Sequence, residues 1–345
     1  MGQVSRRPLT ISAQYGLIDQ SEFFDRQIAS KDMSGYYLLK KGEFAYNKSY
    51  SNDYPWGAVK RLDKYECGAL STLYICFNLD NSIVNSDFIS HYFETNKWHK
   101  GVSDIAGEGA RNHGLLNMSV EDYFLTKHYL PSLIEQEKIS YFLNLITARI
   151  ETQSKIIEKL QSQMLAIYHQ VFSQLNSEVL PLVKLCSIQK GAQVNGIELL
   201  ENGSYYFMNG GIVPSGFYND WNTETNTISI SEGGNSCGYV QYNKERFWSG
   251  GHCYTLQKLN KVSVRYLYHF LKSHEKDIMR LRIGTGLPNI QKKDLEQFLI
   301  KVPSLLEQER LVKLLDSFEL KIGTEEKLFK KYKEQKKFLL SNMFI

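Results

Sequence analysis

The chain has 345 residues, of which 42% are hydrophobic, 13% aromatic and 23% charged. It is therefore long enough for two or three domains with their own cores, and its composition argues against intrinsic disorder. No stretch approaches 18 consecutive apolar residues and the first residues lack an apolar core, so we expect neither a membrane span nor a signal peptide. Five widely spaced cysteines favour reduced thiols and a cytoplasmic location, and the net charge of +4 permits an anionic partner without requiring one.

Residues 1–129 are rich in Tyr, Gly, Asn and β-branched residues that occur in short runs, which is typical of a mixed α/β domain. The patterns predict strands and one amphipathic helix that precedes a closing strand. The strands are expected at 9–13, 36–39, 44–46 and 73–77, and the helix at 86–95.

Residues 130–172 predict one long helix. From Ile139 to Val171, apolar residues advance by alternating steps of four and three, and only Gln153 interrupts the row. A mean step of 3.5 residues keeps such a stripe on one side only if the helix supercoils around a partner. Pro131 suits a first helical turn, where a missing N–H costs nothing. At about 1.5 Å per residue, about 35 residues form a rod of about 50 Å.

Residues 173–301 predict a second α/β domain. Strands are expected at 204–208, 227–231, 238–242 and 253–257, with an amphipathic helix at 264–281. The two domains match in layout more than in sequence, since Gly57 falls near Gly238 and residues 114–117 match 286–289. The opening segment 180–191 has no counterpart in the first domain, which therefore looks shortened at its start.

Residues 302–344 repeat residues 130–172 without a gap. The segment Leu130-Pro-Ser-Leu-Ile-Glu-Gln-Glu137 recurs as Val302-Pro-Ser-Leu-Leu-Glu-Gln-Glu309, and 13 of the 43 aligned positions are identical. A gapless match of this length indicates an internal duplication. The domain order is therefore 1–129, 130–172, 173–301 and 302–345, in which domains and helices alternate.

The two long helices are predicted to pair with each other. A single apolar stripe usually packs on its own domain, but here both copies keep the strict spacing over five heptads. The polar residues Gln153 and Glu325 occupy equivalent positions, where they can fix the register. The predicted fold is α+β, with two α/β domains, two long antiparallel coiled-coil helices and a pseudo-twofold internal repeat. The residues expected at the helix interface are Ile146, Ile150, Gln153, Ile157 and Leu160 of the first helix and Phe318, Ile322, Glu325, Phe329 and Tyr332 of the second.

No catalytic motif stands out. The nearest approach to the Asn/Asp-Pro-Pro-aromatic box of an adenine methyltransferase is Asn52-Asp-Tyr-Pro-Trp56, which lacks the pair of prolines. The cysteines and histidines lack the paired spacing of a zinc site, so no metal is expected. The sequence therefore predicts a non-catalytic chain.

The duplicated box Leu/Val-Pro-x-Leu-x-Glu-Gln-Glu, the helix behind it and the alternation with divergent α/β domains resemble the specificity (S) subunit of type I restriction–modification systems. The resemblance covers nearly the whole chain and is most specific in the box and its helix. It implies that residues 1–129 and 173–301 are target recognition domains, each reading half of a bipartite sequence in double-stranded DNA. The paired helices would then set the half-site spacing.

The same resemblance implies partner proteins. Methyltransferase (M) subunits, two of them under the internal symmetry, would dock on the chain, and restriction (R) subunits would complete the complex. S-adenosylmethionine and ATP would be bound by those partners and no cofactor by this chain. Two rival hypotheses remain: a degenerate S-like scaffold that binds proteins, and a hydrolase or nuclease with an unrecognised site.

Polar loop residues of the two domains are the candidates for DNA contact, because Arg pairs with guanine and Asn with adenine in the major groove. Arg111, Asn112 and His113 lie in a Gly-rich loop of the first domain. The other candidates are Ser49, Tyr50 and Asn52 of the first domain and Asn219, Asn235, Ser236, Arg280 and Arg282 of the second.

Overall fold

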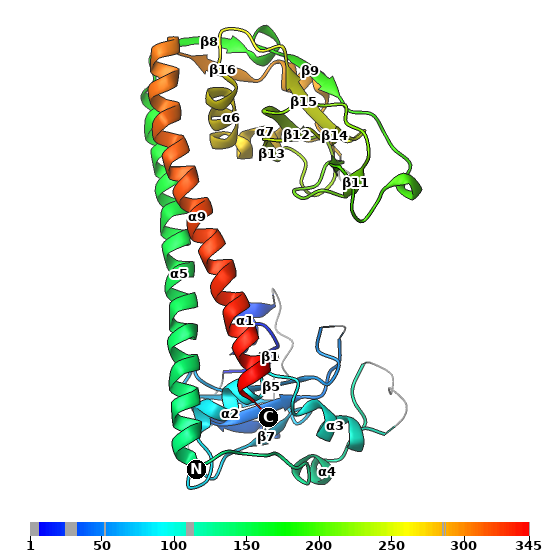
Figure 1. The fold of residues 1–345 in the computed structure, drawn as a ribbon, viewed down its shortest axis with the longest axis vertical. Helices are drawn as coiled ribbons and strands as arrows, with labels where there is room; N and C mark the ends of the chain where they lie inside the picture. The colour runs from blue at the N-terminus through cyan, green and yellow to red at the C-terminus, as the bar shows by residue number, and fades with distance from the viewer. Residues whose placement is uncertain are drawn as a thin grey trace. The chain divides into compact units, whose positions relative to one another are not determined.

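The computed structural model describes residues 7–24, 33–51, 53–107, 114–284, 286 and 288–344. It divides into two compact units (Figure 1): unit 1 comprises Met1–Ser154 with Leu328–Ile345, and unit 2 comprises Lys155–Lys327. Each unit combines an α/β part with segments of both long helices, α5 (Leu133–Gln174) and α9 (Leu305–Met343). The predicted α+β class with two long helices is confirmed.

Unit 1 contains two small sheets and a hairpin around two adjoining cores. Strands β1 (Leu9–Ser12) and β2 (Gly16–Asp19) form the hairpin, β3 (Tyr37–Lys40) pairs with β6 (Cys67–Leu70), and the third group has the order β5-β4-β7. The remaining elements are β4 (Phe44–Asn47), β5 (Ala58–Arg61), β7 (Ile75–Phe77), α1 (Gln20–Phe23), α2 (Ser86–Tyr92), α3 (His99–Ile105) and α4 (Val120–Phe124).

Unit 2 is built on a four-stranded sheet of order β13-β12-β15-β9, with all neighbours antiparallel. A second sheet has the order β11-β10-β14, and β16 pairs with β8. The strands are β8 (Glu178–Pro181), β9 (Ser187–Lys190), β10 (Tyr205–Met208), β11 (Gly216–Tyr218), β12 (Thr227–Ser231), β13 (Val240–Asn243), β14 (Trp248–Ser249), β15 (Cys253–Gln257) and β16 (Leu299–Val302). The helices are α6 (Val264–Ser273), α7 (Glu275–Arg280) and α8 (Lys292–Glu296), with 3-10 turns at Leu182–Lys184 and Gly196–Glu198.

The helix predicted at 264–281 is interrupted at His274, where α6 ends and α7 begins. The prediction of one continuous helix is wrong here. The side chain of His274 accounts for the break, because its Nδ1 lies 2.9 Å from the carbonyl oxygen of Phe270 and so bonds a group at the end of α6.

The two units share a central motif. Strands β5-β4-β7 of unit 1 have the same order and antiparallel pairing as β13-β12-β15 of unit 2. Gly57 and Gly238 precede the corresponding strands β5 and β13, and both have positive φ, +77° and +92°. A Cβ on Gly57 would lie 2.1 Å from the carbonyl oxygen of Asn47, so only glycine fits. The equivalence expected for these two glycines agrees with the structure.

The second α/β part begins with two strands, β8 and β9, that have no counterpart among the described residues of unit 1. Strand β9 extends the central sheet beside β15, and β8 pairs with β16. Among the described residues of unit 1, no strand occupies either place, and residues 127–130, which the shift of 172 aligns with β16, belong to no strand. Among its described residues, unit 1 therefore has no counterpart of β8 or β9, and residues 127–130, at the place of the expected closing strand, form no strand.

Each long helix begins with a capping box. The amide and hydroxyl of Ser132 both donate to Glu135 Oε2, at 3.1 and 2.7 Å, and the Gln136 amide donates to the Ser132 carbonyl. In α9 the amide of Glu307 donates to Ser304 Oγ at 3.3 Å. Pro131 therefore precedes the cap. The prediction that it lies in the first helical turn is wrong, because α5 begins at Leu133. In α9 the Ser304 hydroxyl satisfies a backbone amide of the first turn, whereas in α5 the Glu135 carboxylate satisfies the amide of Ser132.

Within each unit, segments of α5 and α9 run antiparallel. In unit 1, Arg149 Nε donates to Tyr332 Oη at 3.0 Å, and Leu143 shares a core with the last turn of α9. In unit 2, Gln161 Nε2 lies 3.4 Å from Glu326 Oε1. The residues proposed for the interface are buried or half-buried, Gln153 being only 4% exposed. Their individual pairing remains a prediction.

A buried glutamine connects each long helix to its α/β part in the same way. Gln136 Oε1 accepts from the amide of Asn85, the cap of α2, and Nε2 donates to the carbonyls of Ile83 and Pro131. In unit 2, Gln308 Oε1 accepts from the amide of Ser263, the cap of α6. Its Nε2 donates to the carbonyls of Lys261 and Pro303. Both glutamines are 1% exposed. The repeated box therefore places a buried glutamine with three hydrogen bonds at each connection between helix and α/β part.

An aromatic contact from the opposite helix completes each connection. Phe344, the residue after α9, packs on Phe88 and Tyr92 of α2, with ring centroids 5.1 and 6.0 Å apart. At the equivalent place in unit 2, Phe172 of α5 packs on Tyr266 and Phe270 of α6 at 6.1 and 5.2 Å. Each α/β part is thus held by the beginning of one long helix and the end of the other.

Candidate nucleic-acid interface

Two equivalent loops carry several of the predicted DNA-contacting residues. In unit 1 the loop after β4 forms an antiparallel bridge between Ser49 and Leu115, and the amide of Tyr50 donates to the Gly114 carbonyl at 2.9 Å. In unit 2 the loop after β12 forms the corresponding bridge between Gly233 and Asn289.

The hydrogen bonds on either side of the bridge also correspond. The amide of Gly234 donates to the Pro288 carbonyl at 3.0 Å, and the amide of Ile290 donates to the Glu232 carbonyl at 2.9 Å. In unit 1 the amide of Leu116 donates to the Lys48 carbonyl at 2.9 Å. The repeat therefore presents two loops of the same construction at the end of the same strand of the central sheet.

The candidates of unit 1 lie at or beside this loop. Ser49 and Tyr50 are exposed, the tyrosine ring by 45%. Asn52, Arg111, Asn112 and His113 lie outside the described residues. Backbone hydrogen bonds hold the described residues on either side of Arg111, Asn112 and His113. The Gly107 amide donates to the Asn117 carbonyl, and the Gly114 carbonyl accepts from the Tyr50 amide.

The candidates of unit 2 lie in two places. Asn235 and Ser236 follow the bridge in the loop before β13. Arg282 precedes Ile283, which forms an antiparallel bridge with Asn289, the bridge partner of Gly233. The structure therefore brings these polar residues and Arg282 to one region. Arg280 is exposed and pairs with Asp277 at 2.6 Å. Asn219 follows β11 in the second sheet and is exposed, so it does not belong to this group.

The structure adds a cluster beside the unit 2 loop that the sequence pattern did not select. Glu232 is 8% exposed and forms an ion pair with Lys190 at 2.6 Å, and its second oxygen lies 3.6 Å from His252 Nδ1. Tyr254 Oη also donates to Glu232 at 3.0 Å. Lys190 and His252 keep about half or more of their side chains exposed. The sequence examined His252 only for metal spacing, and no local signal linked it to residues 20 and 62 positions away.

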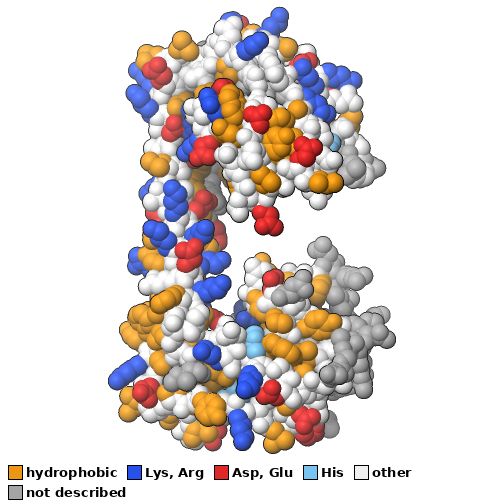
Figure 2. Space-filling model, turned by 45° about the vertical axis from the view of Figure 1, so that its right-hand side comes forward, with side chains coloured by type: hydrophobic (Ala, Val, Ile, Leu, Met, Phe, Trp, Pro, Cys, Tyr) orange, Lys and Arg blue, Asp and Glu red, His pale blue; other side chains and the backbone are white. Residues whose placement is uncertain are grey.

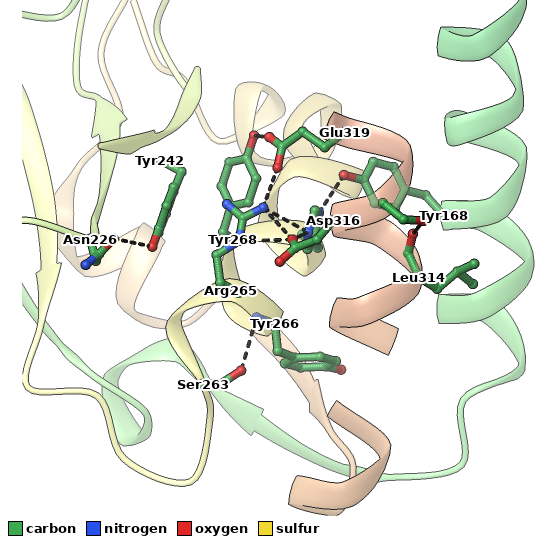
Figure 3. Close-up of polar contacts among 12 residues, drawn as sticks. Tyr168, Asn226, Tyr242, Ser263, Arg265, Tyr266, Tyr268, Leu314, Asp316 and Glu319 are labelled. Atoms are coloured by element: carbon green, nitrogen blue, oxygen red, sulfur yellow. Dashed lines mark hydrogen bonds and ion pairs between the residues drawn. The ribbon is translucent and has the colours of Figure 1, made fainter. Parts of the chain in front are cut away.

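A second polar network joins α6 to α9 in unit 2 (Figure 3). The Arg265 guanidinium donates to Asp316 at 2.5 Å and to Glu319, and Tyr268 Oη donates to Glu319 at 3.0 Å. His269 is fully buried, with Nε2 2.7 Å from Asp316 and Nδ1 2.9 Å from Tyr168 Oη. Burial lowers the pKa of His269, although its hydrogen bond to Asp316 opposes that effect.

The network has a counterpart of different charge in unit 1. His91 Nε2 lies 2.8 Å from Asn144 Oδ1, and Asn144 stands where the repeat has Asp316. Asn144 Nδ2 in turn donates to Asp87 at 2.8 Å, and Arg61 donates to the same carboxylate. The histidine contact is therefore common to both units, while its ionic partners differ.

The ligand atoms of His269, Asp316 and Glu319 lie within 4.8 Å of one another, close enough to hold a cation. The Arg265 guanidinium already bonds both carboxylates and supplies the positive charge that a metal ion would bring. We therefore interpret the cluster as the ion-pair connection between α6 and α9. Within the described residues, no helix is both long and apolar enough to cross a membrane.

Comparisons with known proteins agree with this architecture. Residues 175–332 match the type I restriction modification DNA specificity domain. The chain is 37% identical over 144 residues to a putative type I specificity subunit of Mycoplasma pneumoniae, a match covering 41% of this chain and 38% of the relative. A putative type I specificity subunit of Mycoplasma genitalium is 34% identical over 122 residues, covering 35% and 32%. The matches thus span well under half the length of these curated relatives.

The fold is also similar to a solved structure. The crystal structure of a type I restriction–modification S subunit from M. genitalium superposes with a TM-score of 0.63 over 92% of this chain and 87% of that one, at 20% identity. The similarity therefore extends over both units and both long helices. Taken with the sequence matches, it agrees with the resemblance found in the duplicated box: residues 175–332 match a type I specificity domain, and the chain is similar to the specificity (S) subunits of type I restriction–modification systems.

Proposed function

We propose that this chain confers DNA sequence specificity on a type I restriction–modification enzyme, with each unit reading one half of a bipartite target. The observation that carries the proposal is the pair of equivalent loops, after β4 and after β12, that the duplicated fold presents. Loops positioned by a rigid sheet are suited to base contacts because their sequence can vary without loss of the core. Residues 1–129 and 173–301 are the proposed recognition domains, and segments 130–172 and 302–345 the spacers.

The proposed role is not catalytic. The chain would choose the sequence, while M subunits bind S-adenosylmethionine and methylate it, and R subunits use ATP. Because the target is cellular DNA, we place the chain in the cytoplasm. The modest net charge of +4 fits a protein whose partners share the phosphate contacts, which normally supply most of the affinity for DNA.

One alternative rests on a specific observation. Unit 1 lacks the counterparts of β8 and β9 among its described residues, so its loop is supported by a smaller sheet. A degenerate S-like scaffold that binds proteins through unit 1 would account for that difference. The two functions differ in one respect: a DNA-specificity subunit determines the sequence of both half-sites, whereas the scaffold determines only one.

The DNA-specificity proposal is tested by a methylome. Deletion of the gene should abolish adenine methylation at one bipartite motif, and Asn235→Ala should weaken discrimination at one half-site by about tenfold, the usual cost of a lost base contact. Arg310→Ala, on the exposed face of α9, is the matched control and should leave the motif unchanged. Unaltered methylation after gene deletion would exclude the proposal, and dependence on one half-site alone would favour the scaffold.

Docking of two M subunits is supported by exposed apolar residues that recur at the shift of 172. Ile134 and Leu306 are 66% and 61% exposed, and Phe142 and Leu314 are 43% and 42% exposed. Figure 2 shows that hydrophobic side chains occur at the surface of the molecule among those of Lys and Arg. Monomeric proteins seldom expose apolar patches of this kind unless a partner covers them.

This docking proposal predicts a change in stoichiometry. Phe142→Glu or Leu314→Glu should each remove one M subunit from the complex, and the double variant should remove both, because each charge would be buried without a partner. Sedimentation or mass photometry of the reconstituted complex measures the result. Leu165→Glu, exposed by 63% but aligned with a lysine in the repeat, is the control. A full complex with the double variant would contradict the proposed surface.

A further inference from the structure

Unit 1 contains an apolar groove of about 620 Å³ between its α/β part and the ends of both long helices. The groove is lined by Phe88, Tyr92, Leu130, Ile139, Met343 and Phe344, and Tyr129 stands at its edge with 83% of its side chain exposed. We call it the Tyr129 groove. Glu135 and Lys138 supply charges beside it, so the site combines an apolar floor with a polar rim.

The internal repeat shows what occupies the equivalent place in unit 2. Val302 and Leu311 correspond to Leu130 and Ile139. Strand β8 pairs beside Val302, and Leu175 and Leu311 together line a smaller pocket of about 410 Å³. Leu175 and Leu180 pack against the core of unit 2. Strand β8 pairs antiparallel with β16, with Glu178 opposite Val302 and Leu180 opposite Ile300.

The difference in exposure shows that the unit 1 groove lacks this cover. Val302 is 8% exposed beneath β8, whereas Leu130 is 36% exposed. Residues 127–130 form no strand with any other residue that the structure describes. Within the part of unit 1 that the structure describes, no strand pairs with the backbone that corresponds to the partner of β8.

We propose that the Tyr129 groove binds an extended apolar segment of a partner protein other than a second copy of this chain, and that the segment adds as an antiparallel strand beside residues 127–130. Strand addition satisfies the free backbone groups of an edge, and pockets for alternate side chains give the selectivity. The segment would resemble residues 175–181, with two leucines five positions apart as in Leu175 and Leu180. This interaction is independent of which bases the loops read.

A synthetic peptide with the sequence of residues 173–185 is the probe. Fluorescence anisotropy with the full chain should show saturable binding of one peptide per chain. A peptide with aspartate in place of Leu175 and Leu180 should bind at least tenfold more weakly, because two charges would enter an apolar groove. Leu130→Lys in the full chain should weaken binding of the original peptide by a similar factor. Leu320→Lys, at a residue of α9 that is 73% exposed, should leave the binding unchanged.

Two further measurements keep the test decisive. Circular dichroism should show that Leu130→Lys leaves the fold intact, and a benzophenone at the Leu180 position of the peptide should cross-link to residues 129–139 or 343–344. Cross-links confined to unit 2, or binding that does not saturate, would overturn the proposal. Release of monomers from a dimer of the chain on adding peptide would also overturn it, because the groove would then be covered by a second copy.

Discussion

Phe344→Ala is expected to destabilise unit 1 by about 3–4 kcal/mol and to leave unit 2 nearly unchanged. The ring is 4% exposed and packs on Phe88 and Tyr92, so its removal opens a cavity in the core. The equivalent variant, Phe172→Ala, should have the opposite distribution, because Phe172 packs on Tyr266 and Phe270 in unit 2.

Hydrogen exchange resolved by peptide measures the two units separately. Phe338→Ala removes a ring of the same size that is 67% exposed, and it should cost less than about 0.5 kcal/mol. Equal losses of protection in both units after Phe344→Ala would contradict the assignment of this ring to the unit 1 core.

Gln308→Met is expected to lower the free energy of unfolding of unit 2 by about 3 kcal/mol. Methionine keeps the length and unbranched shape of the side chain but removes all three hydrogen bonds of Gln308. The buried amide of Ser263 and the carbonyls of Lys261 and Pro303 would lose this partner, and each unsatisfied group costs about 1–3 kcal/mol, in part recovered by relaxation. Gln136→Met should have a similar effect on unit 1.

Chemical denaturation monitored by hydrogen exchange of individual peptides measures the free energy of unfolding of each unit, and so distinguishes the two variants. Gln163→Met, on an exposed position of α5, is the control and should be nearly neutral. A change below about 0.5 kcal/mol for Gln308→Met would show that water satisfies the same groups, and the glutamine would then not be a principal connection between helix and domain.

The long helices were predictable because their apolar periodicity and the repeated box are local signals. Strands such as β12 and β15 were predicted at their observed bounds, since their β-branched and aromatic residues are bounded by glycines. The short strand β14 was not predicted and β16 was expected only as a closing strand without bounds, because their pairing depends on partners far away in the sequence. The break at His274 escaped detection because the apolar pattern continues through it.

The candidate interface was predictable in part. Ser49 and Asn235 were selected as polar loop residues, and the structure places their loops at equivalent positions. The cluster of Lys190, Glu232 and His252 could not be selected, since only the sheet brings these residues together. The role of Gln136 was also hidden, because a buried glutamine in an amphipathic helix resembles any other polar position until its partners are known.

The composition of the two units has a consequence for biosynthesis. Unit 2 is one continuous stretch, Lys155–Lys327, whereas unit 1 needs both Met1–Ser154 and Leu328–Ile345. The whole of unit 2 is therefore synthesised before the last segment of unit 1, and the earlier domain waits for about 190 further residues, or about 10–40 s at ordinary translation rates, before Phe344 is added to the chain. During that interval the surface around Phe88 and Tyr92 lacks its final cover, which makes the N-terminal domain the part most dependent on chaperones.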